Sequence, residues 1–236
     1  MNPLAILGEV FAAYRRHWRI LLGAAFLLFG AFNAFELLVP EVEFDHLRVR
    51  VLIEALLLGA GSFAISSYEE AFFEGVVASA AAEWRMGRPR PNLLAVARSV
   101  PYLALIGVNA VIAVGTSVGL LLLIVPGLLF GTYTALAPAL TKIEHLGVRA
   151  SLRRSFELVN GNLWPVFVLI WGIYLATEAA TSGLDQLLHG VGLEYFTKTT
   201  AEALLAPLYG LAAVLVTYDL IARRASTPPP GGAPGP

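Results

Sequence analysis

Apolar residues gather into long runs that are separated by short polar connections. A bilayer core about 30 Å thick is crossed by an α-helix of about 20 apolar residues, and most of the runs have that length. The pattern predicts an all-α, polytopic membrane helix bundle with six transmembrane helices. The predicted spans are residues 20–39, 51–82, 100–124, 128–143, 163–180 and 203–221.

Three stretches that precede the first, third and fifth spans have a helical pattern of a different kind. In the first stretch Leu4, Leu7 and Phe11 recur at steps of three and four residues, whereas Glu9 and Arg16 lie on other faces. Short basic amphipathic helices of this type lie in the headgroup plane with their arginines toward phosphate. We therefore predict three cytoplasmic-side interfacial helices, at residues 3–16, 92–99 and 148–160.

Basic residues collect on one side of this predicted bundle. Of the 16 Lys and Arg residues, only Arg48, Arg50 and Lys198 fall in connections on the other side. Lys and Arg near span ends favour retention in the cytoplasm. The chain is accordingly expected to be a multi-pass protein of the cell membrane with cytoplasmic N- and C-termini. The segment 226–236, nearly all proline and glycine after its first residues, is expected to be a disordered tail.

The composition of the chain argues against a soluble protein and against several classes of enzyme. The chain is 57% hydrophobic and 14% charged and has a mean hydropathy of +0.71, which leaves too little polar surface for a soluble globule. With no cysteine it has no disulfide, thiolate metal site or thiol nucleophile. We find no Ser-His-Asp set, phosphate-binding glycine loop or His-x-x-x-His pair, and predict no catalytic residue, cofactor or metal. Membrane lipids are the expected partners, with a protein partner or homo-oligomer as alternatives and no nucleic acid.

A turn must interrupt the apolar stretch from residue 100 to residue 143. As one helix it would be about 66 Å long, roughly twice the thickness of a bilayer core. Pro126 and Gly127 are the strongest helix-breaking signal there, because proline lacks an N–H and glycine permits positive φ. Gly115, Gly119, Gly127 and Gly131 form small-xxx-small steps that would let the two helices approach closely.

Three carboxylates stand inside the second predicted span: Glu69, Glu70 and Glu74. A carboxylate at mid-bilayer costs about 2.5–3.5 kcal/mol on insertion scales, so three of them need partners, protonation or water. This span is long, and its inner end can extend into the cytoplasm, where the glutamates would be solvated. The alternative interpretation is a polar cavity that faces the cytoplasm and binds a cation or protons.

Four motifs within residues 81–224 resemble the membrane domain of the bacterial glycerophosphoryl diester phosphodiesterase membrane-domain family and related uncharacterised six-span families. They are GRP at residues 87–89, IVPG at 124–127, ASLRRSFELVNGN at 150–162, and PL at 207–208 followed by YDL at 218–220 with Arg223. The last motif departs from the family pattern at Thr217 and Ile221. The resemblance implies an integral membrane module of the bacterial inner membrane.

The phosphodiesterase barrel that is sometimes fused to such a domain needs about 250 residues of its own. Because the membrane domain already occupies this sequence, the family name is not evidence of an activity. We expect a non-enzymatic membrane module that contacts lipid or scaffolds a partner. The alternative is a transporter or exporter of a small amphipathic or lipidic solute that uses Glu69, Glu70 and Glu74.

Two groups of polar residues are candidates for contacts at the cytoplasmic side. The candidate lipid-headgroup contacts are Arg149, Arg153, Arg154, Arg88 and Arg90. The candidate structural clamp comprises Tyr218, Asp219, Arg223 and Asn162. In the clamp Asp219 would accept from Arg153 or Arg154, and Asn162 would cap the fifth span; an i,i+4 pair of Asp219 with Arg223 is the alternative.

The first testable prediction concerns topology. A cysteine introduced at Glu43 should react with a membrane-impermeant reagent in intact cells, because the connection 40–50 is expected outside. A cysteine at Arg88 should react only after permeabilisation. The reverse labelling pattern would refute the six-span arrangement.

Overall fold

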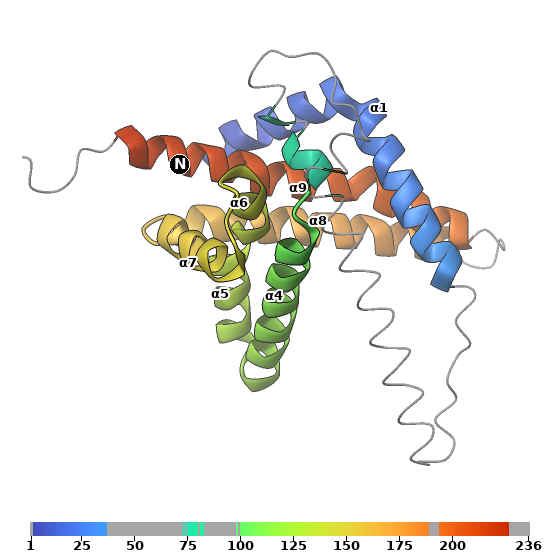
Figure 1. Cartoon of the computed structure of the whole chain (residues 1–236). Coiled ribbons are helices and arrows are strands. Elements are labelled where there is room, and N and C mark those ends of the chain that lie inside the picture. The colour runs from blue at the N-terminus through green and yellow to red at the C-terminus, as the bar shows by residue number, and fades with distance from the viewer. Residues whose placement is uncertain are drawn as a thin grey trace, which may run out of the picture.

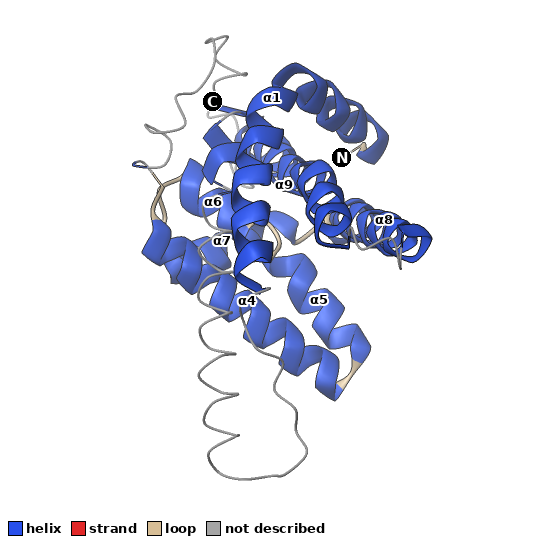
Figure 2. Cartoon of the chain, turned by 90° about the vertical axis from the view of Figure 1, so that its right-hand side faces the viewer, coloured by secondary structure: helices blue, strands red, loops and turns tan. Residues whose placement is uncertain are grey.

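The computed structural model describes residues 2–36, 73, 75–79, 81–82, 98, 100–188 and 194–226, and every element in this part of the chain is helical (Figure 1). Figure 2 shows the same helices from the side. The elements are α1 (Pro3–Glu36), α4 (Tyr102–Leu122), α5 (Ile124–Thr134), α6 (Ala137–Ile143), α7 (Val148–Val159), α8 (Leu163–Leu188) and α9 (Glu194–Ser226).

Four segments of the described chain are long and apolar enough to cross a membrane. They are Tyr102–Leu120, Ile124–Ile143, Leu163–Ala180 and Thr199–Ser226. They coincide with the predicted spans 100–124, 128–143, 163–180 and 203–221. The predicted span 51–82 and the helix 92–99 lie mostly outside the described residues, as does the tail after Ser226. The membrane character of the fold is thus supported, with four candidate spans.

The predicted interfacial helix 3–16 and the span 20–39 are not separate elements. Residues 3–36 form one helix of 34 residues, α1, because no glycine or proline interrupts residues 9–22. Figures 1 and 2 both show that α1 bends between an N-terminal and a C-terminal limb. The two sequence patterns thus fall in one bent helix, and a separate interfacial helix at residues 3–16 is not confirmed.

The turn between α4 and α5 lies at Leu123 and not at Pro126–Gly127 as predicted. Leu123 has an extended backbone (φ −160°, ψ 138°), and α5 begins at the next residue. Pro126 is then the third residue of α5, where a backbone N–H has no partner within the helix. Proline is compatible with this first turn, so it follows the break and does not form it.

Glycines bring α4 and α5 into close contact along the hairpin. A Cβ atom added at Gly119 would lie 2.7 Å from the Cα of Gly127, and one added at Gly115 would lie 2.3 Å from the Phe130 ring. Real side chains do not approach so closely, so these positions require glycine. The small-xxx-small contact predicted from the sequence is confirmed.

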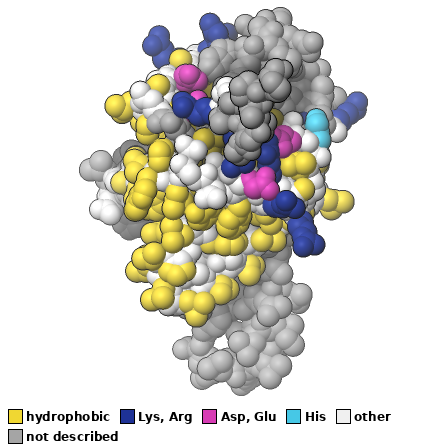
Figure 3. Space-filling view, turned by 90° about the vertical axis from the view of Figure 1, so that its left-hand side faces the viewer, with side chains coloured by type: hydrophobic (Ala, Val, Ile, Leu, Met, Phe, Trp, Pro, Cys, Tyr) yellow, Lys and Arg dark blue, Asp and Glu magenta, His cyan; other side chains and the backbone are white. Residues whose placement is uncertain are grey.

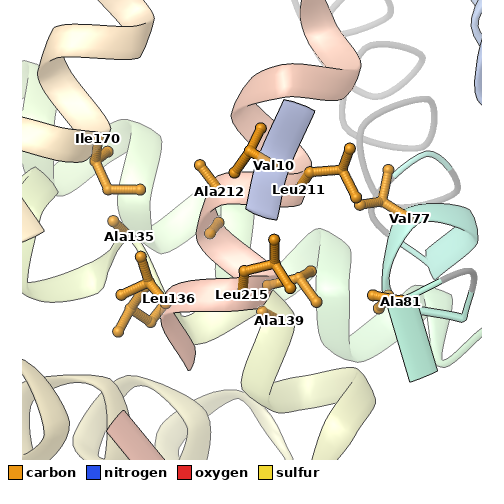
Figure 4. Close-up of a cluster of buried hydrophobic side chains, with 14 of the residues drawn as sticks. Val10, Val77, Ala81, Ala135, Leu136, Ala139, Ile170, Leu211, Ala212 and Leu215 are labelled. Carbon is orange, nitrogen blue, oxygen red and sulfur yellow. The ribbon is translucent and has the colours of Figure 1, made fainter. Parts of the chain in front are cut away.

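The core lies where α9 meets α1, α8 and the α5–α6 segment (Figure 4). Leu211 and Leu215 of α9 are buried there beside Val10 of α1, and Leu136 and Ile170 approach from the other side. α8 is also tied to α5, because the Trp171 Nε1 donates to the Thr132 hydroxyl at 2.9 Å. The α4–α5 hairpin projects away from this core (Figure 1).

Replacing Gly119 by alanine should destabilise the protein by about 1–3 kcal/mol, since the added methyl group overpacks a contact between two backbones. Gly23→Ala is the matched control, because a Cβ there meets nothing within 4 Å. In a helix that change should be neutral or slightly stabilising. Denaturation in detergent, followed by circular dichroism, measures both; equal stability of the two variants would contradict the close packing.

Candidate lipid-contacting site

An apolar groove of about 380 Å3 lies between the N-terminal limb of α1 and the helices α8 and α9. Its lining is aliphatic and aromatic except for Thr177, whose hydroxyl donates to the Tyr174 carbonyl of its own helix at 2.7 Å. The lining residues are Pro3, Leu4, Leu7, Val10, Phe11, Val168, Leu169, Gly172, Ile173, Ala176, Thr177, Leu205 and Leu208. The groove can therefore hold hydrocarbon but offers little to orient a polar ligand.

The floor and the rim of the groove differ in exposure. Val10 and Leu169 are almost fully buried, whereas Leu4 is 78% exposed and Phe11 is 55% exposed. Gly172 leaves room in the middle, since a Cβ there would meet nothing within 4 Å. A contiguous exposed apolar surface of this kind is typical of membrane contacts and of ligand-binding grooves.

A hydrogen bond fixes α1 across α9 next to the groove. The Tyr14 hydroxyl donates to the Leu204 carbonyl oxygen at 3.0 Å, and burial raises the pKa of the Tyr14 phenol. Leu205, the next residue of α9, lines the groove. The bond thus holds the N-terminal limb of α1 in the position that forms one wall.

The predicted headgroup arginines of α7 do not act as one group. Arg153 bonds Glu157 at 3.0 Å, and Arg154 bonds Glu144 at 3.2 Å and lies 3.6 Å from Glu157. The hydrogen bond from Arg153 is the main reason that the pKa of Glu157 is lowered. Arg149 is exposed and forms no ion pair with a described carboxylate, whereas Arg88 and Arg90 lie outside the described residues.

The buried face of α7 does not follow the helical pattern of its apolar residues. Val148, Leu152, Phe156 and Val159 recur at steps of three and four residues, but the helix buries Ser151, Ser155, Leu158 and Val159. Phe156 stays 39% exposed and stacks on Tyr133 at 5.0 Å between ring centroids. α7 is therefore rotated so that two serines point inward.

These serines have partners near the break between α5 and α6 at Ala135 and Leu136. The Ser155 hydroxyl donates to the Tyr133 carbonyl oxygen at 2.6 Å. The hydroxyls of Ser151 and Thr141 lie 2.7 Å apart and share a hydrogen bond. Both serines are fully buried. The spacing of four residues between the two serines places them on one face of a helix. That face was not predicted to be buried, because the prediction followed apolar residues alone.

The predicted clamp between α7 and α9 does not form, and its residues make contacts within or next to their own helices. Asp219 accepts from Arg223 at 2.6 Å within α9, which is the i,i+4 alternative, and Arg153 and Arg154 pair elsewhere. Tyr218 is half-buried and packs against the core. Asn162 precedes α8, and its carbonyl accepts from the Val166 N–H at 3.1 Å, as expected of a residue at a helix start.

The predicted polar cavity at Glu69, Glu70 and Glu74 lies outside the described residues. Within the part of the chain that the structure describes, no three His, Asp or Glu side chains are grouped so as to hold a metal ion. No family model, curated protein or solved structure matches the chain. The groove is the candidate site that rests on described residues.

Ser155→Ala should destabilise the protein by about 1–3 kcal/mol, because the Tyr133 carbonyl oxygen would lose its buried hydroxyl partner. Ser226→Ala is the control, since that exposed hydroxyl bonds only the Arg223 carbonyl at the end of α9; its effect should stay within about 0.5 kcal/mol. Denaturation in detergent compares the two. A Ser155 variant as stable as the control would show that the inward serines are not needed.

Proposed function

We propose that this protein is a non-enzymatic membrane module of the glycerophosphoryl diester phosphodiesterase membrane-domain type, which holds a lipid acyl chain in the groove between α1, α8 and α9. The proposal includes six spans and cytoplasmic termini. Four candidate spans and the basic residues on one predicted side support this arrangement. The four motifs at residues 87–89, 124–127, 150–162 and 207–223 support the family assignment.

The observation that carries the proposal is the chemistry of the groove. Its volume of about 380 Å3 lies in the range of small-molecule sites, roughly 300–1,000 Å3. Those sites normally carry a few polar groups that fix orientation, and this one has only Thr177, which bonds its own helix. An acyl chain already lies in hydrocarbon within the bilayer, so it enters such a surface without desolvation of polar groups and is held there by van der Waals packing. A hydrocarbon chain is the ligand class that this lining favours.

The surface around the bundle is consistent with a lipid environment. Figure 3 shows apolar side chains over the lower part of one face, with charged side chains gathered above them. The α4–α5 hairpin ends in Leu122, Leu123, Ile124 and Val125, each of which is at least 65% exposed. An apolar tip of this kind is costly in water and stable in hydrocarbon.

The alternative function, transport of an amphipathic or lipidic solute, depends on Glu69, Glu70 and Glu74. These residues lie outside the described part of the chain, so transport remains a prediction from the sequence. No described contact favours it over the acyl-chain proposal.

Filling the groove tests the proposal. A phospholipid with a photoreactive group in its acyl chain should crosslink in nanodiscs to the groove residues of α8 (168–177). Gly172→Phe should reduce this crosslinking about tenfold, equal to about 1.4 kcal/mol, because the ring occupies the hydrocarbon path.

Gly183→Phe is the matched control on the same helix: a Cβ there also meets nothing within 4 Å, but the residue does not line the groove. This variant should leave the crosslinking unchanged. Crosslinking that Gly172→Phe does not reduce would overturn the proposal.

A further inference from the structure

The groove ends beside a basic and aromatic stripe of α1, and this inference rests on the function proposed above. Leu4, Leu7 and Phe11 line the groove from one face of α1. Arg15 follows Phe11 by four residues and Trp18 follows it by seven, so both lie on the same face of the helix. Arg15 is about 6 Å further along the axis than Phe11.

The cations of this stripe are available to an anion. Arg15 and Arg19 are exposed, and neither forms an ion pair with a described carboxylate. The Arg19 guanidinium lies 5.4 Å from the centre of the Trp18 ring. Glu9, the acidic residue of this limb, is about 200° around the helix from Phe11 and so lies on the opposite face. The arginines of α7 differ, because Arg153 and Arg154 already pair with glutamates.

Helix geometry directs Arg15 toward the groove. Side chains on an α-helix lean toward its N-terminus, so the guanidinium of Arg15 is carried back over the turn that contains Phe11. The bond between Tyr14 and Leu204 holds this turn against α9. A cation therefore lies at the end of an apolar groove, and an amphiphile with an anionic headgroup matches both parts.

We propose that the groove and Arg15 with Arg19 form one site for an anionic phospholipid. One acyl chain lies along Leu4, Leu7 and Phe11, and the headgroup phosphate meets the two guanidinium groups. Arg15 and Arg19 supply two exposed cations on this limb of α1, and cations near a membrane surface favour a headgroup of net negative charge.

Headgroup selectivity is the property to measure. The purified full chain is placed in nanodiscs with trace photoreactive phosphatidylglycerol or photoreactive phosphatidylcholine, both carrying the same acyl chain. Groove crosslinking with the anionic lipid should exceed that with the zwitterionic lipid about tenfold. R15Q/R19Q should reduce the ratio to near one and leave crosslinking by the zwitterionic lipid unchanged.

Two further variants make the result specific. R98Q/R224Q removes two exposed arginines that lie off the groove stripe, and it should keep the ratio. R15K/R19K keeps the charge and should also keep most of the ratio, which covers the case in which the glutamine variant folds poorly. An equal loss of the ratio in R98Q/R224Q would overturn the site, because it would reflect only general surface charge.

The outcomes separate this inference from the function on which it rests. Equal groove crosslinking by the two lipids in the unmodified protein would refute the anionic site and leave acyl-chain binding intact. Absence of groove crosslinking by either lipid would refute acyl-chain binding as well. Crosslinks between two copies through α1 in place of lipid would assign the groove to a protein interface and overturn both.

Discussion

Backbone amides and carbonyls at membrane depth must find partners within the protein, and this constraint governs the whole structure. Helices meet it along their length, so the problem is confined to the places where helices stop. Between residues 100 and 143 the helical backbone is interrupted twice, at Leu123 and at Ala135–Leu136. The first break lies at the exposed tip of the α4–α5 hairpin. The second lies inside the fold, where the Ser155 hydroxyl bonds the nearby Tyr133 carbonyl.

The break between α5 and α6 at Ala135–Leu136 accounts for the orientation of α7 and for the pairing of its arginines. α7 must present hydroxyls to α5 and α6, so Ser151 and Ser155 turn inward and Phe156 turns outward. The arginines of α7 are then held on the other faces, where Arg153 and Arg154 pair with Glu157 and Glu144. A helix that the sequence suggested for lipid headgroups is thus largely committed to internal contacts. Among the described residues, the arginines of α1 near the groove are exposed and form no ion pair with a described carboxylate.

The groove itself arises from the way α1 packs on α9. The N-terminal limb of α1 buries Val10 and the Tyr14 bond against α9, while Leu4 and Phe11 extend beyond the contact. α8 supplies the opposite wall, with Gly172 as its open position. Residues of α1 and of the distant, consecutive helices α8 and α9 thereby form one apolar surface.

The sequence alone determined the helical class, four of the segments that can span a membrane and the close glycine contact of α4 with α5. These properties depend on hydrophobic length and on residue size, which are local. Tertiary structure decided the position of the turn at Leu123, the rotation of α7 and the choice of Arg223 as the partner of Asp219. It also formed the groove. Those outcomes depend on which helix surfaces pack together. The pattern of apolar residues along the sequence cannot show that Ser155 is buried against the Tyr133 carbonyl. Nor can it show that the exposed Leu4 lines a groove.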